Sequence, residues 1–199
     1  MLLKIINKKF EKFKKKLKKH HFKYQVKKMN GDVLIIGKIA VNQRVELSGS
    51  GQITFKEGVI LGYTPSPYYK STEIYIEARN KDAKIEIGEN VVINNNAAIV
   101  ADHTSITIGR DTLIGPNFVC FDSHFHHLDP KKRRSTGYSC ASVTVGENVF
   151  IGINVTVLKG STIGDNCVIG AGCTISGNIP PNSIVSCTNQ VRISELKCQ

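Results

Sequence analysis

The stretch VGENVFIGINVTVLKGSTIGDNCVIGAGCTI, residues 145–175, repeats with a period of six residues. Each step begins with an aliphatic residue, at Val145, Ile151, Val157, Ile163, Ile169 and Ile175. A small residue follows four positions later, at Val149, Val155, Ser161, Cys167 and Cys173. A period of six fits neither an isolated α-helix nor an alternating strand. It is typical of a solenoid of short strands whose aliphatic side chains point inward, so we predict an all-β solenoid. Glycine follows the aliphatic residue at four steps, and we expect it to permit the turn at each corner.

The same spacing extends toward the N-terminus. Aliphatic residues recur every six positions at Ile87, Ile93 and Ile99, and the pattern resumes at Ile108, Ile114 and Cys120. The next repeat position, Val145, comes 25 residues after Cys120, which is not a multiple of six. A loop, residues 121–144, should therefore leave the solenoid there. Residues 33–62 are strand-like but irregular, and the two prolines within 64–72 indicate another loop. We assign the solenoid to residues 31–185 and a C-terminal tail to 186–199.

The net charge of +11 is concentrated at one end of the chain. Residues 1–28 hold twelve lysines and one acid, whereas the rest of the chain holds fifteen basic and fifteen acidic residues. Apolar residues recur within this segment at spacings of three and four, at Leu3, Ile6, Phe10, Phe13 and Leu17. We predict a basic amphipathic helix that lies on an anionic membrane, or packs its stripe on the solenoid or a partner subunit. Specific nucleic-acid binding is not expected, because no base-reading motif is present.

Composition places the protein among ordinary globular proteins, with 41% hydrophobic residues. No apolar run is long enough to span a bilayer, and the lysine-rich N-terminus lacks the apolar segment of a signal peptide. We therefore expect a cytoplasmic protein, with the basic helix offering peripheral contact with the inner face of the cell membrane. The six cysteines form no C-x-x-C pair, so reduced structural thiols are expected.

Three segments resemble the hexapeptide-repeat acyltransferases, nearest the maltose and galactoside O-acetyltransferases and their polysaccharide-modifying relatives. They are VFIGINVTVLKGSTIGDNCVIGAGCTISGNIPPNSIV (149–185), HHLDPKKRR (126–134) and GENVVINNNAAIVADHTSITIG (88–109). The resemblance, which covers about residues 85–199, implies a left-handed parallel β-helix and a homotrimer with acetyl-CoA between subunits. It also implies metal-free acetyl transfer to a sugar hydroxyl of a surface polysaccharide, such as capsule or lipopolysaccharide, or of its precursor.

The resemblance further implies roles for individual residues. Matching the family's H-P-L-D-P to residues 126–130 makes His126 the general base, whereas an ungapped match from residues 113–117 leaves His124 as a competitor. Asp122 or a loop carbonyl could hold the other ring nitrogen. The expected sugar contacts are Asn94, Asn96, Asp102 and Asp122. The expected acetyl-CoA contacts are Gly152, Ile153, Lys159, Ala171 and Arg192, with the Ile153 N–H as oxyanion donor. The asparagines could instead be corner residues, since Asn tolerates left-handed backbone.

Two functions of other classes compete with this interpretation. His103, His124 and either His126 or His127 could supply three ligands to a catalytic zinc, as in carbonic anhydrases of the same fold. The chain could also be a non-catalytic β-helix scaffold that its basic tail recruits to a membrane.

Overall fold

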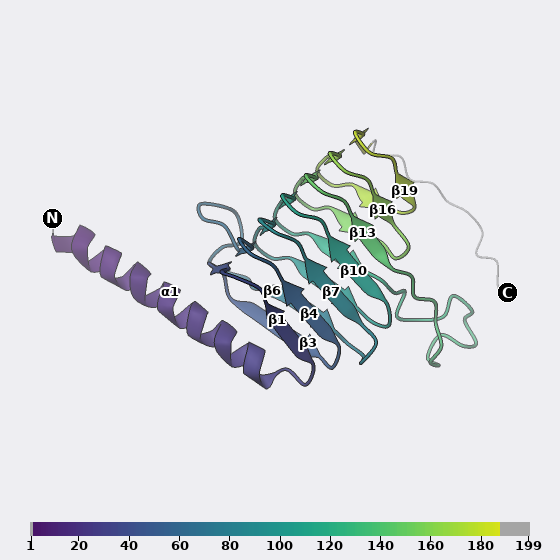
Figure 1. Ribbon diagram of the computed structural model, residues 1–199, viewed down its shortest axis with the longest axis horizontal. Helices are drawn as coiled ribbons and strands as arrows, with labels where there is room; N and C mark the ends of the chain where they lie inside the picture. Colours follow the sequence, from purple (N-terminus) through teal and green to yellow (C-terminus); the bar gives the residue numbers. More distant parts are fainter. Residues whose placement is uncertain (1, 188–199) are drawn as a thin grey trace.

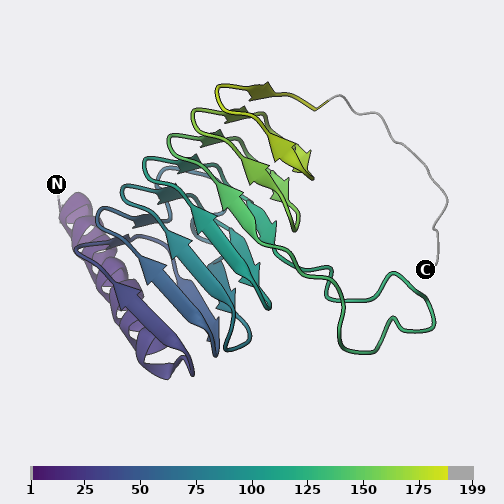
Figure 2. The same ribbon diagram turned by 45° about the vertical axis from the view of Figure 1, so that its right-hand side comes forward.

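The computed structural model describes residues 2–187, which form a helix followed by a three-sided coil of short strands (Figures 1 and 2). The chain visits three sheets in turn, so neighbouring strands of one sheet lie three strands apart in sequence. Strand pairing within each sheet is parallel, as between β7 (Lys84–Ile87) and β10 (Ser105–Ile108). This is the left-handed parallel β-helix that the family resemblance implied.

The three faces of the prism are named sheets A, B and C. Sheet A contains β1 (Asp32–Ile35), β4 (Gln52–Phe55), β7, β10, β13 (Val143–Val145), β16 (Thr162–Ile163) and β19 (Asn178–Ile179). Sheet B contains β2 (Ala40–Val41), β5 (Ile60–Leu61), β8 (Val92–Ile93), β11 (Leu113–Ile114), β14 (Phe150–Ile151), β17 (Val168–Ile169) and β20 (Ile184–Val185). Sheet C contains β3 (Val45–Gly49), β6 (Ile74–Ala78), β9 (Ala98–Ala101), β12 (Val119–Phe121), β15 (Thr156–Val157) and β18 (Thr174–Ile175).

The six-residue repeat supplies the interior of the prism. The aliphatic positions of 145–175 are at most 3% exposed, and the small positions between them are at most 1% exposed. Strand pairing stacks equivalent residues, so Ile114, Ile151 and Ile169 form one inward column. Burying such side chains contributes on the order of 1.5–3 kcal/mol each. The prediction of a solenoid with an aliphatic core is confirmed.

The expected role of the repeat glycines was wrong. Gly152 does not have the positive φ that favours glycine; that conformation falls two residues later, at Asn154 (φ 59°), and in other coils at Asn148 and Asn166. A Cβ added to Gly152 would lie 2.8 Å from the backbone nitrogen of Ala171 in the next coil. Glycine after the aliphatic residue is therefore required because successive coils approach closely, and the left-handed turn is made by asparagine or, at Gly160 and Gly172, by another glycine.

Helix α1 (Leu2–Lys28) covers the open N-terminal end of the prism with its last turns. Phe22 is 3% exposed and stacks edge-on against Phe55, with 6.0 Å between ring centroids. Gln25 is also buried, and Val26 and Met29 pack against the same core. The segment 1–28 is thus joined to the β-helix through this packed end.

The first half of α1 projects away from the prism (Figure 1). Phe10, Phe13 and Leu17 remain 54%, 56% and 52% exposed. These residues belong to the predicted apolar stripe, but the face that packs on the β-helix is the one with Phe22 and Gln25. The expectation that the stripe itself packs on the solenoid of the same chain is therefore wrong for its described members. Within residues 2–187, no helix combines the length and apolarity needed to cross a membrane.

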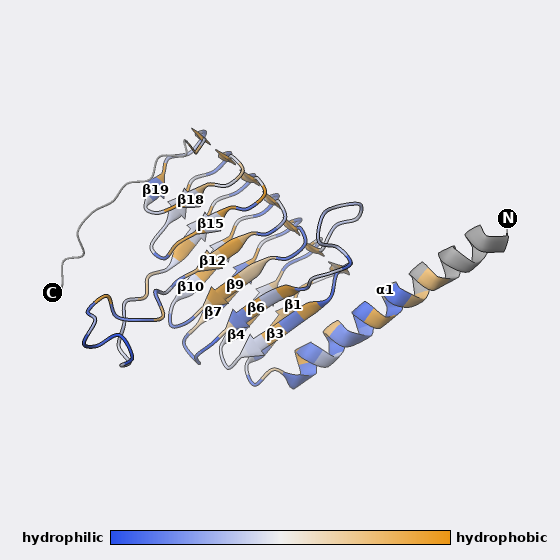
Figure 3. Cartoon of the chain, turned by 180° about the vertical axis from the view of Figure 1, so that it is seen from behind, coloured by the Kyte–Doolittle hydropathy of each residue, from blue (hydrophilic) through white to orange (hydrophobic). Residues whose placement is uncertain are grey.

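Two loops leave the prism at different edges. Residues 62–73 connect sheet B to sheet C, and the buried side chain of Asn95 holds them by donating to the carbonyls of Tyr63 (2.9 Å) and Pro67 (2.8 Å). Residues 122–142 connect sheet C to sheet A and extend from the body as a largely hydrophilic loop (Figures 2 and 3). Both loops were predicted from the sequence, and the second holds the histidine cluster.

Candidate active site

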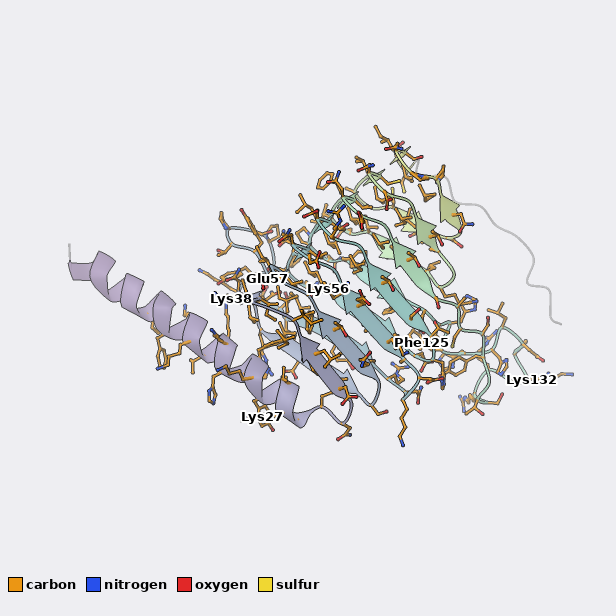
Figure 4. All side chains as sticks on the ribbon, in the orientation of Figure 1. Lys27, Lys38, Lys56, Glu57, Phe125 and Lys132 are labelled. Carbon is orange, nitrogen blue, oxygen red and sulfur yellow. The ribbon has the colours of Figure 1, made fainter. Side chains whose placement is uncertain are left out.

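The histidine loop encloses a cavity of about 390 Å³ against the edge between sheets C and A. Its lining includes His124, His126 and His127, Ser139 of the returning segment of the loop, and Lys159 of the next coil. Phe125 lies at the base of the loop beside the β-helix, and Lys132 lies toward its outer end (Figure 4). The cavity therefore gathers three imidazoles, two lysines (Lys132 and Lys159) and the carboxylate of Asp129 at one corner of the prism.

Buried Asp122 anchors the base of this loop. Its Oδ1 accepts from the Asp102 N–H at 2.7 Å, and its Oδ2 accepts from the N–H and hydroxyl of Thr104, both at 2.8 Å. The side chain is 0% exposed. We had expected Asp122 to contact the sugar or to orient an imidazole. The structure instead commits both oxygens to the preceding coil, which corrects that assignment.

The three histidines differ in what holds their rings. The Nδ1 of His126 lies 2.9 Å from the Arg133 carbonyl, which requires a proton on Nδ1 and leaves Nε2 as an acceptor. The Nε2 of His127 lies 2.9 Å from the Thr136 carbonyl, so in that ring Nε2 carries the proton. His126 therefore has the tautomer suited to a base at Nε2, and the partner is a loop carbonyl, one of the two alternatives left open by the sequence.

His124 lies closer to the body of the protein. Its backbone N–H donates to the Ser139 carbonyl at 3.4 Å. Partial burial, together with the positive charge of Lys159, lowers the pKa of the His124 imidazole. The Lys159 Nζ donates to the Ser139 hydroxyl at 2.8 Å. Lys159, expected to contact acetyl-CoA, is thus held within the histidine cavity, where it favours a neutral His124.

Asp102 lies at the same edge, one coil below the loop. It is 0% exposed; its Oδ1 accepts from the Asn80 amide at 3.0 Å and lies 3.8 Å from the Arg79 guanidinium. Its Oδ2 has no hydrogen-bond partner among residues 2–187. Interaction with the nearby Asp102 carboxylate, together with partial burial, raises the pKa of the Tyr138 hydroxyl. A buried carboxylate oxygen without a partner is costly and suits a donor brought by a ligand.

The other expected site residues lie at the edge between sheets B and C. Asn94 accepts from the Asn95 N–H at 2.8 Å; Asn96 has a φ of 61° and donates to Asn117 at 2.9 Å in an asparagine ladder. Asn96 therefore has the geometry of a corner residue, which was the alternative to its expected contact with the sugar. The remaining members of this group are Gly152, Ile153 and Ala171. Arg192 lies outside the described residues.

One chain thus divides the expected site between two edges. The group with His126, His124, Asp102 and Lys159 follows sheet C, whereas the group with Gly152 and Ile153 follows sheet B. Strands of sheet C separate the two groups in every coil. The structure does not bring the expected base and the expected oxyanion donor together within one chain.

Comparison with known proteins identifies the repeat. Residues 142–177 match the family described as bacterial transferase hexapeptide (six repeats). The galactoside O-acetyltransferase of Escherichia coli is 40% identical over 104 residues, which cover 52% of this chain and 50% of that protein. The 142–177 segment of the chain is therefore similar to the hexapeptide-repeat transferases. Another E. coli relative, the putative lipopolysaccharide biosynthesis O-acetyl transferase WbbJ, is 36% identical over 110 residues, 51% of this chain and 56% of that protein.

Solved hexapeptide-repeat structures share the fold. A Vibrio cholerae hexapeptide-repeat acetyltransferase, solved with acetyl-CoA, has a TM-score of 0.55 at 24% identity, covering 89% of this chain and 76% of that one. The polySia-specific acetyltransferase NeuO has a TM-score of 0.62 at 19% identity, covering 82% and 79%. The chain spans about half the length of the curated relatives it matches.

Sequence reasoning missed several residues of this hexapeptide-repeat site. Arg79 and Asn80 come from a lower coil and Tyr138 from the returning segment of the loop, and no motif links them to Asp102 in sequence. The zinc alternative is not supported by the geometry, because His103 pairs instead with Asp82 at 3.2 Å. In the described part of the chain, no group of three or more His, Cys, Asp or Glu residues could hold a metal ion.

Proposed function

We propose that the protein transfers an acetyl group from acetyl-CoA to a sugar hydroxyl of a surface polysaccharide or its precursor. The observation that supports this function best is that the same edge of the prism carries His126, whose Nδ1 is held by a loop carbonyl, and Asp102, whose buried Oδ2 has no partner among the described residues. The names of the relatives as galactoside, lipopolysaccharide and polySia acetyltransferases agree with a sugar acceptor.

In this mechanism the acceptor hydroxyl donates to the open oxygen of Asp102 or to His126. The Nε2 of His126 takes the hydroxyl proton as the sugar oxygen attacks the acetyl carbonyl of the thioester. The Ile153 N–H stabilises the oxyanion of the tetrahedral intermediate. Collapse of the intermediate breaks the C–S bond, and the proton on His126 goes to the departing CoA sulfur. The products are the acetylated sugar and CoA.

The direct test is an assay of the full chain with acetyl-CoA and a panel of sugars, including oligosaccharides of surface polysaccharides. We expect release of one CoA thiol for each O-acetyl group formed. The non-catalytic scaffold is the competing function. Absence of both acetyl transfer and acetyl-CoA hydrolysis across the panel would favour that scaffold and contradict the proposed enzyme.

We also propose that the active unit is a homotrimer. The base and the oxyanion donor follow different edges, so a second copy must bring its sheet B edge to the histidine edge of the first. Sheet B supports this arrangement, because its outward column is entirely apolar: Ala40, Ile60, Val92, Leu113, Phe150, Val168 and Ile184. Leu113 and Phe150 are 50% and 52% exposed. Such a continuous apolar face is typical of an interface.

The projecting half of α1 supports peripheral attachment at the cytoplasmic face of an anionic membrane. Its exposed stripe lies beside lysines, a combination that places apolar rings in the bilayer interface and cations near anionic headgroups. Because Phe22 covers Phe55, removing all of residues 1–28 would uncover the core of the β-helix in addition to deleting the exposed stripe. A test of attachment therefore has to leave the packed end intact.

Replacing Phe10, Phe13 and Leu17 together by serine should weaken sedimentation with anionic vesicles at least tenfold. The reason is that each ring or branched chain contributes of order 1 kcal/mol or more when it enters the interface. The thermal unfolding midpoint should stay unchanged, since these side chains are already exposed. Leu128→Ser, at a loop residue that is 58% exposed, is the control and should bind like the parent. Unchanged binding of the triple variant would show that the stripe is not the anchor.

A further inference from the structure

The largest cavity described in the structure lies away from the histidine loop. It has a volume of about 770 Å³ and lies between α1, the 62–73 loop and the outer face of sheet C. Lys14 and Lys18 line it from the helix, Tyr69 and Lys70 from the loop, and Tyr75 from β6. Asn96, at the edge between sheets B and C, also borders it. The proposed transfer chemistry has no use for this cavity.

The cavity is strongly cationic. Lys14, Lys18, Arg44 and Lys70 line it against one acid, Glu73, which gives a net charge of +3. The Lys18 Nζ donates to the Asn42 carbonyl at 2.8 Å and lies 4.0 Å from the centre of the Tyr69 ring. The Arg44 guanidinium is paired with Glu73 at 3.1 Å and with Glu46, outside the cavity lining, at 2.6 Å, so the excess positive charge comes from the lysines. Two of the cations are therefore held in place at the wall, where lysines act as point charges for phosphate.

The neutral part of the lining suits a sugar. Tyr69, Tyr75 and Ser71 line the same cavity with two aromatic rings and a hydroxyl, whereas the Thr72 hydroxyl donates to the Tyr68 carbonyl at 2.9 Å. Aromatic faces with nearby hydroxyls match the alternating apolar and polar surfaces of a pyranose. The volume exceeds what one phosphate needs, since ligand pockets for small organic molecules begin near 300 Å³. Charge and size together fit a phosphate or diphosphate attached to a sugar.

A second, mostly apolar cavity of about 560 Å³ adjoins the first. Leu17 and Tyr24 line it, and it shares Lys18 and Arg44 with the cationic cavity. Leu17 belongs to the exposed stripe of α1, so the polar cavity opens beside the surface proposed to enter the membrane. A ligand that fits both cavities has an anionic, sugar-bearing head and an apolar chain.

We propose that the cationic cavity binds the phosphate or diphosphate of a lipid-linked sugar, with the lipid chain directed along Leu17 and Tyr24 toward the bilayer. This inference rests on the proposed function, because it makes the lipid-linked glycan the acceptor. The cavity borders the sheet B edge, the same edge that a trimer brings to the histidine loop of its neighbour. Holding the phosphate there places the attached sugars near that shared groove.

The test compares binding of the full chain to two kinds of vesicle of equal surface charge. One contains a long-chain polyprenyl diphosphate sugar, and the other contains phosphatidylglycerol alone. Lys14→Gln with Lys70→Gln is the cavity variant. Lys16→Gln with Lys19→Gln removes the same charge from exposed helix positions that do not line the cavity. We expect the parent and the control to prefer the diphosphate vesicles by roughly tenfold, and the cavity variant to lose that preference.

Each other outcome overturns the inference or part of it. Equal losses in the cavity variant and the control would show that only surface charge binds the vesicles. Equal affinity for inorganic pyrophosphate and for the lipid would make a soluble diphosphate the ligand. Acetyl transfer to soluble sugars, measured in parallel, should be unchanged in the cavity variant. Loss of the lipid preference in the cavity variant with intact transfer therefore supports the cavity as the lipid-phosphate site. Absence of transfer in the parent would refute the proposed function and the acceptor role of the lipid, while the vesicle preference would still test the phosphate site.

Discussion

Replacing His126 with alanine should lower kcat for acetyl transfer by roughly 10²–10⁴-fold, the usual contribution of a positioned general base. The change should affect KM less, because the imidazole acts on the proton in the transition state. The physical reason is the hydrogen bond of Nδ1 to the Arg133 carbonyl, which in the neutral imidazole leaves Nε2 as the acceptor. The measurement is steady-state kinetics with acetyl-CoA and the best acceptor of the sugar panel.

The neighbouring histidines provide the controls. His127→Ala should change kcat little, since its Nε2 proton is directed to the Thr136 carbonyl. His124→Ala is the decisive comparison, because His124 lies in the same cavity and partial burial, with the charge of Lys159, lowers its pKa. Full activity of the His126 variant with loss in the His124 variant would move the base two residues upstream. Full activity in both would contradict the mechanism.

Introducing glutamate at both Leu113 and Phe150 should dissociate the proposed trimer into monomers of 21.9 kDa. The two side chains are paired neighbours in the outward column of sheet B, and each would carry a charge into an apolar interface. Acetyl transfer should fall by roughly 10²-fold or more, because the oxyanion donor of one copy would no longer reach the base of another. Light scattering and the kinetic assay measure the two effects.

A matched variant tests whether the effect is specific to that face. Thr156→Glu with Thr174→Glu adds the same two charges to paired outward positions of sheet C. We expect this variant to keep the oligomeric state of the parent. A parent protein that is itself monomeric at micromolar concentration would rule out the shared site. A monomeric Leu113 and Phe150 variant with full activity would show that one chain suffices.

Much of the site could be located from sequence, but its partners could not. The interval after Cys120 interrupts a strict period, so the loop and its histidines were evident without a structure. Asp102 was identified by resemblance, and its buried, open oxygen agrees with a place for a ligand. Arg79 and Tyr138 were not identified, because strand pairing and loop closure bring them to Asp102 across many residues. Asp122 was misassigned because a carboxylate can accept hydrogen bonds from a sugar or from backbone N–H groups. In the folded protein Asp122 is buried, and its oxygens accept from the backbone of the preceding coil.

The six-residue period alone was enough to establish the coil, its aliphatic interior and the extruded loop, because each step must present one side chain to the same narrow core. The distribution of charge likewise showed that the basic character belongs to the first 28 residues. Three-dimensional packing was needed for the rest. It showed that Phe22 rather than the apolar stripe faces the core, that glycine serves the contact between coils, and that the site residues occupy two edges. Those outcomes depend on which surfaces meet across coils, and a local pattern does not contain that information.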